Sequence, residues 1–216
     1  MKKLSIILIL LISFQGICQK EEAVTKTKYQ QGMTKAFDLW KNDKPWEAAN
    51  LFERIATADP DNWLPPFYVA QLNVLNSFNE KDKAKLTAQL GKAKDFLNDA
   101  TAISKNNPEI MVLEAQWYTA WVVFDGQQYG MTYAAKIAGI YNEASVLAPN
   151  NPRVVLGKTE WDMGSAQFFG QPIDKYCPEV QRAVALFDTF VPEGEFFPQG
   201  GKEYAESVMV KTCKEK

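Results

Sequence analysis

The stretch VLAPNNPRVVLG (146–157) has two close counterparts earlier in the chain, ISKNNPEIMVL (103–113) and IATADPDNWLP (55–65). Each contains an apolar run, a short turn with Asn or Asp and a proline, and a second apolar run. Asn and Asp side chains accept hydrogen bonds from the free N–H groups that begin a helix, and proline is tolerated at the first helical position. We therefore interpret the three stretches as joints, each of which ends one helix and starts the next.

Between the joints, apolar residues recur three and four positions apart, as in Phe52 with Ile55 and Leu97 with Ala93 and Ala100. This spacing places an apolar stripe along one side of each helix. The alternation that is typical of strands is nearly absent. We therefore predict an all-α chain. Its helices are expected at 29–42, 45–58, 63–79, 82–105, 108–124, 132–148, 152–167, 177–190 and 201–214.

The joints divide the chain into units that begin near Tyr29, Trp63, Pro108 and Pro152. Recurrence at a period of about 20 to 50 residues is typical of stacked helical arrays. Glycines and prolines precede the last expected helix, which favours a cap on the end of the stack. The predicted division has units near 29–62, 63–107, 108–151 and 152–195, with a cap at 196–216.

The first unit resembles a tetratricopeptide repeat (TPR). Ala36 and Ala48 match the small residues of its two helices, Phe52 matches the packing aromatic and Pro60 the closing proline. Later units are about ten residues longer than the usual repeat, and Ile137 stands where a small residue is usual. The resemblance implies a right-handed α-α superhelix, a TPR-like solenoid of about four helical hairpins plus a C-terminal capping helix.

Three segments are similar to segments of small exported TPR-like proteins of Bacteroidetes. They are NWLPPFY (62–68), FFGQP (168–172) and GKEYAE (201–206). The resemblance covers most of the chain. It implies the fold and export, and it implies no activity.

The N-terminus has the features of a signal peptide at 1–18, because Lys2 and Lys3 precede the apolar run 4–14. That run is shorter than the roughly 20 residues of a membrane span. We expect cleavage after Cys18, leaving a repeat domain at 19–216, although lipidation of Cys18 is an alternative. The expected location is the periplasm or the outer membrane. There the chain would have no membrane span, and peripheral association with the envelope is compatible with it.

Composition argues against several classes of function. Without Lys2 and Lys3 the chain has 22 basic and 26 acidic residues, a balance that does not favour nucleic acid. The chain has no histidine, which removes the commonest general base and histidine zinc ligands. We predict no catalytic residues, no metal, no cofactor and no enzymatic activity. An enzyme that uses Glu114, Asp125 or Glu160 is a third alternative, which no residue spacing supports.

Cys177 and Cys213 are the cysteines that remain after the leader. In an oxidising compartment such a pair forms a disulfide. We predict this disulfide, with two free buried thiols as the alternative.

The predicted binding residues are Trp117, Trp121, Trp161 and Phe169. Stacks of the TPR kind expose the first helix of each hairpin on the concave face, where partners bind. The alternative is that these rings only pack between hairpins. We predict a non-enzymatic scaffold that binds a protein or peptide through this face. The alternative function is a small-ligand or glycan-binding protein with an aromatic-lined groove.

Overall fold

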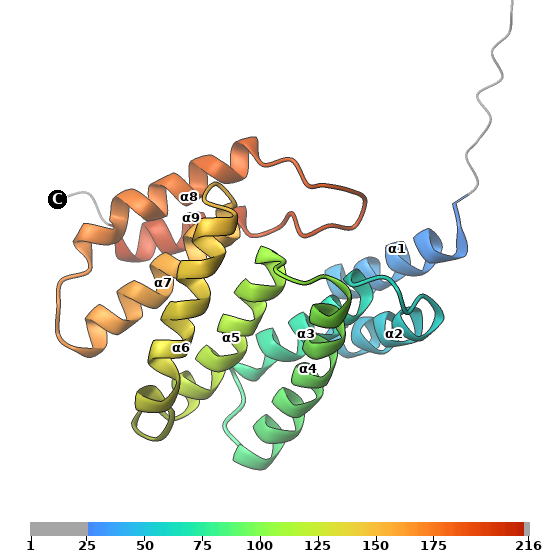
Figure 1. Ribbon diagram of the computed structural model, residues 1–216, viewed down its shortest axis with the longest axis horizontal. Helices are drawn as coiled ribbons and strands as arrows, with labels where there is room; N and C mark the ends of the chain where they lie inside the picture. Colours follow the sequence, from blue (N-terminus) through green and yellow to red (C-terminus); the bar gives the residue numbers. More distant parts are fainter. Residues whose placement is uncertain (1–25, 214–216) are drawn as a thin grey trace, which may run out of the picture.

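The computed structural model describes residues 26–213, so the predicted signal peptide and Cys18 lie outside the described residues. In this part the chain forms nine α-helices, one 3-10 turn η1 (Asp174–Tyr176) and no strand (Figure 1). The α-helices are α1 Lys28–Lys41, α2 Pro45–Ala58, α3 Leu64–Ser77, α4 Lys83–Ile103, α5 Pro108–Phe124, α6 Gly126–Leu147, α7 Pro152–Phe168, α8 Cys177–Thr189 and α9 Lys202–Thr212. The prediction of an all-α, TPR-like superhelix is confirmed.

The helices pack as successive antiparallel hairpins, α1 with α2, α3 with α4, α5 with α6 and α7 with α8. Helix α9 packs against α8 and closes the end of the stack. No helix of the described chain is both long enough and apolar enough to cross a bilayer. The unit boundaries and the division into a leader and one repeat domain stay predictions.

The joints have the predicted chemistry. The side chain of Asn107 accepts the N–H of Glu109 at 3.0 Å, and that of Asn151 accepts the N–H of Arg153 at 2.9 Å. Pro108 begins α5. The joints therefore place the N-terminal ends of α3, α5 and α7 at one edge of the stack, which we call the joint edge.

Small residues allow close packing between helices. Ala36, Ala48 and Ala93 are fully buried and belong to the same core cluster as Phe52. A Cβ atom added at Gly157 of α7 would lie 2.9 Å from the ring of Tyr141 on α6. The short side chains of the sequence are thus what lets the hairpins stack.

Helix α6 begins earlier than predicted. Residues 126–130 lie outside the predicted helix 132–148, but they form the first turns of α6. The Asp125 carboxylate accepts the N–H of Gln128 at 2.9 Å and caps the helix. Capping at Asp125 outweighs the low helix propensity of Gly126 and Gly130.

Residues 190–201, between α8 and α9, form an extended segment that we call the strap. It leaves the end of α8, reaches the first hairpin and returns to α9 (Figure 1). At its tip, the ring of Phe196 lies 5.8 Å from that of Tyr29 and 5.9 Å from that of Phe37. The C-terminal tail thus contacts the opposite end of the stack as well as capping its own.

The predicted disulfide is present. Cys177 at the start of α8 bonds to Cys213, which follows α9, with 5.5 Å between their Cα atoms. The disulfide ties the end of α9 to the start of α8, the second helix of the last hairpin.

Candidate functional site

Five aromatic side chains gather where α5 meets α6. We call this set the aromatic face: Trp117, Tyr118, Trp121, Tyr129 and Tyr133. Its ring centroids form a closed circuit, in which neighbours are 4.8 to 6.2 Å apart. The rings of Tyr129 and Tyr133 are parallel within 4° and 5.8 Å apart.

Helical spacing builds the aromatic face. Trp117 and Trp121 are four apart on α5, and Tyr129 and Tyr133 are four apart on α6, so each pair shares one side of its helix. Tyr118 is buried, and the other four rings are half-buried. The indole N–H of Trp117 donates to the carbonyl of Leu90 on α4 at 2.7 Å, which fixes the ring. The hydrogen bond thus orients the Trp117 ring, and the four half-buried rings reach solvent.

Three lysines frame these rings. The Lys94 ammonium, on α4, lies 5.4 Å from the Trp117 ring centre, and the Lys136 ammonium, on α6, lies 4.7 Å from that of Tyr118. Lys83 lies 6.0 Å from the Tyr129 ring centre. A hydrogen bond with Tyr118 raises the pKa of Lys136. Lysines of α4 and α6 thus form a rim around the aromatic face, in which Lys94 also pairs with Glu114.

The structure brings together only part of the predicted binding set. Trp117 and Trp121 belong to the aromatic face. Trp161 is half-buried on α7, where it packs on the core between α5, α6 and α7. Phe169 follows α7, is 73% exposed and contacts Phe168. In the described chain no ring contact joins Trp161 or Phe169 to the aromatic face.

Sequence reasoning missed the two tyrosines of α6. Tyr129 was assigned to a connector, although its spacing of four from Tyr133 in YGMTY (129–133) is a helical signal. The tyrosines complete the circuit that the tryptophans begin.

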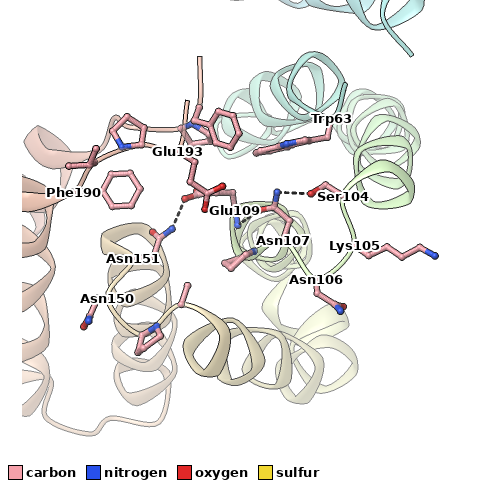
Figure 2. Close-up of a pocket in the computed structure, with 17 residues that line it drawn as sticks. Trp63, Ser104, Lys105, Asn106, Asn107, Glu109, Asn150, Asn151, Phe190 and Glu193 are labelled. Atoms are coloured by element: carbon pink, nitrogen blue, oxygen red, sulfur yellow. Dashed lines mark hydrogen bonds between the residues drawn. The ribbon is translucent and has the colours of Figure 1, made fainter. Parts of the chain in front are cut away.

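A second feature is a pocket of about 520 Å³ at the joint edge, which we call the edge pocket (Figure 2). The α4–α5 and α6–α7 joints form one wall, and the strap forms the other. Its aromatic lining residues are Trp63, Phe190 and Phe197.

An ion pair joins Glu109, which lines the edge pocket, to Arg153, which does not. Arg153 donates to both oxygens of Glu109, from Nε at 2.7 Å and from Nη2 at 2.5 Å. The amide of Asn151 also donates to Glu109. Both charged side chains are nearly buried, at 12% and 11% exposure, so the Glu109 charge is compensated within the protein.

The three carboxylates considered for an enzyme have structural partners. Glu114 pairs with Lys94, and Asp125 caps α6. Glu160 accepts the Tyr204 hydroxyl at 2.5 Å, and burial raises the pKa of Glu160. Glu160 does not line the edge pocket. Within residues 26–213, no group of three or more Cys, Asp or Glu side chains has the geometry of a metal site.

The fold and these surfaces together define an α-solenoid of the TPR-like class. No protein-family model and no curated protein sequence matches the chain. Solved structures do match. The chain is similar to the HusA haemophore from Porphyromonas gingivalis, with 21% identity and a TM-score of 0.74, over 88% of this chain and 96% of that one.

A thermophilic TPR protein from Thermus thermophilus is similar at 16% identity and a TM-score of 0.58. The match covers 74% of this chain and 75% of that one. At these identities the similarities establish the fold.

Proposed function

We propose that this chain is a non-enzymatic carrier of a haem-type ligand and that the aromatic face is its binding site. The observation that carries the proposal is the closed circuit of five rings framed by three lysines. The similarity to a haemophore over nearly the whole of both chains supports haem as the first ligand to test.

The aromatic face matches the chemistry of a porphyrin. A porphyrin is a flat apolar ring with two carboxylate side chains, and flat ligands stack on exposed aromatic rings. Lys94 and Lys136 approach Tyr118 from α4 and α6, so two ammonium groups lie beside the same ring. Lys136 can pair with one ligand carboxylate, and a second carboxylate would share Lys94 with its present partner Glu114.

The aromatic face also offers oxygen ligands for the iron of a haem. The chain has no histidine, and a tyrosine oxygen is one of the other haem ligands that proteins use. Tyr129 and Tyr133 are half-buried on the aromatic face, with their rings stacked. We propose that one of these phenol oxygens binds the haem iron.

The edge pocket suits haem less well. Glu193 lines it and would repel the propionates, and its lining contains no tyrosine, methionine or cysteine. Haem binding is therefore assigned to the aromatic face alone.

A carrier of this kind acts outside the cytoplasm. We propose export through the leader at 1–18, with the protein in the periplasm or at the outer membrane. Binding of a protein or peptide through the concave face stays a prediction.

The test is a titration of ferric haem, and of metal-free protoporphyrin IX, into the chain without its predicted signal peptide. We expect saturable changes in the Soret absorption for both ligands. Trp121→Leu should weaken the binding of both ligands by about tenfold, since it removes a stacking surface worth about 1.4 kcal/mol. Phe169→Ala, which removes an exposed ring outside the aromatic face, should leave both affinities unchanged.

Tyr129→Phe combined with Tyr133→Phe separates ligation from stacking. Both rings remain, so protoporphyrin should bind as before, whereas the ferric haem spectrum should lose its tyrosinate character. Absence of saturable binding by either ligand would overturn the proposed function. A Phe169→Ala effect equal to that of Trp121→Leu would move the site away from the aromatic face.

A further inference from the structure

The edge pocket has a carboxylate that the rest of the molecule leaves unpaired. Glu193 lies on the strap, is exposed and points into the pocket (Figure 2). Among residues 26–213, no ion pair or hydrogen bond involves its side chain. Glu195, two residues later, differs because it accepts the side-chain amide of Gln30 on α1 at 2.7 Å.

The other charges of the pocket do not compensate Glu193. Arg153 is already engaged by both oxygens of Glu109. Lys105 is exposed, and its side chain extends away from the centre of the pocket (Figure 2). Glu193 is therefore a carboxylate that faces the pocket without an ion-pair partner in the described part of the chain.

Aromatic rings surround this charge. Trp63 and Phe197 meet edge to face at 5.4 Å on one side of the pocket, and Phe190 lies on the other. Aromatic faces attract cations, most strongly where water is partly excluded. The protein already uses this property, because the Arg153 guanidinium lies 4.4 Å from the Phe190 ring centre.

The strap holds Glu193 in position. On the N-terminal side of Glu193, Phe190 packs on Arg153. On its C-terminal side, Phe196 packs among the rings of the first hairpin. Gly194 is also constrained, since a Cβ atom there would lie 3.1 Å from the Phe197 ring. A ligand would therefore meet a carboxylate whose backbone is already ordered, which lowers the entropic cost of binding.

We infer that the edge pocket binds an extended peptide segment of a partner protein through an arginine or lysine side chain. The cation pairs with Glu193 and lies against Trp63 and Phe197. The volume of about 520 Å³ exceeds that of one side chain and leaves room for neighbouring residues. This site is independent of the haem proposal.

The test uses an acetylated and amidated Gly-Arg-Gly peptide and the same peptide with citrulline, which is neutral and nearly isosteric with arginine. Binding is followed by the indole ¹H–¹⁵N signal of Trp63, assigned with Trp63→Phe. We expect the arginine peptide to shift this signal with millimolar affinity and the citrulline peptide to leave it in place.

Glu193→Gln should weaken arginine-peptide binding about fivefold, the loss of one partly exposed ion pair. Glu195→Gln removes the same charge from the same strap outside the pocket, and it should change the affinity by less than about twofold. The inference fails if Trp63 does not respond, if citrulline binds as well as arginine, or if the two glutamate variants weaken binding equally. None of these results depends on haem.

Discussion

The hydroxyl group of Tyr68, on α3, donates a hydrogen bond of 2.6 Å to the backbone carbonyl of Phe196, 128 residues later in the chain. Tyr68 is 3% exposed, and burial raises its pKa, so its hydroxyl stays protonated and able to donate. Phe196 has a φ of 65°, in the left-handed region that few non-glycine residues adopt. The hydrogen bond and the ring contacts together hold this conformation, so the strap is anchored at its tip.

Removing the anchor should destabilise the protein. We expect Phe196→Ala to lower the free energy of unfolding by about 2 kcal/mol, less than for a fully buried ring because Phe196 is half-buried. Urea denaturation followed by circular dichroism measures the change. Val191→Ala, at an 82% exposed strap position, should cost less than about 0.5 kcal/mol. Equal effects of the two variants would show that the strap tip is not anchored.

The disulfide should stabilise the C-terminal end of the stack. Cys177→Ser combined with Cys213→Ser opens a loop with a sequence separation of 36 and should cost about 3 kcal/mol. Thermal unfolding of the variant, and of the wild type in reducing agent, should give the same lowered midpoint. A reducing agent should not change the variant, and a further drop there would point to another cause.

Close packing at Gly157 gives a prediction with a matched control. In Gly157→Ala the new methyl group meets the Tyr141 ring at 2.9 Å, and we expect a loss of about 1 to 3 kcal/mol. Gly139 is also in a helix, but a Cβ atom there meets nothing within 4 Å. Gly139→Ala should therefore stabilise the protein by about 0.5 to 1 kcal/mol. Chemical denaturation measures the free energy of unfolding of both variants, which should change in opposite directions.

The raised pKa of Glu160 predicts a pH dependence of stability. The folded state binds this proton more tightly than the unfolded state, so stability falls as pH rises from the ordinary glutamate value of 4.5 through the raised value. Glu160→Gln cannot ionise and still accepts the Tyr204 hydroxyl. The melting temperature of the variant relative to that of the wild type should therefore increase as pH rises through this window. A constant difference would contradict the assignment.

The lysine rim should contribute charge to haem binding. Lys94→Gln combined with Lys136→Gln should weaken haem binding about fivefold to tenfold, because two partly exposed ion pairs are lost. Added salt should weaken the wild type more than this variant. Lys92→Gln is the control, since Lys92 also lies on α4 but contacts the ring of Phe96, outside the aromatic face. Haem titrations at two salt concentrations provide the measurement.

The fold could be predicted because its determinants are local. Asn107 and Asn151 act as helix caps within two residues of their own positions, and Ala36 and Ala48 lie at fixed places in a repeat. The strap could not be predicted in the same way. Its path depends on contacts of Phe196 with Tyr29 and Tyr68, far away in the sequence, and no periodic pattern marks them.

The candidate site was only partly predictable for a related reason. Helical spacing pairs Trp117 with Trp121 and says nothing about which helix lies beside them. The contributions of Lys94 and Lys136 depend on how α4 and α6 flank α5, which is a property of the stacked hairpins. The prediction that Trp161 and Phe169 share a site with Trp117 stays a prediction. Trp161 packs on the same core cluster as Trp117, and in the described chain neither Trp161 nor Phe169 has a ring contact with the aromatic face.

The strap changes how the array is connected. In an open solenoid each repeat is coupled only to its nearest neighbours, so end repeats can fray one at a time. Here the last hairpin is also coupled to the first through the contact of Phe196 with Phe37 on α1, and to the second through Tyr68 on α3. The two ends of the array are thus coupled to each other as well as to their neighbours. The first hairpin cannot melt without also releasing the C-terminal segment, and unfolding should proceed as a single cooperative unit.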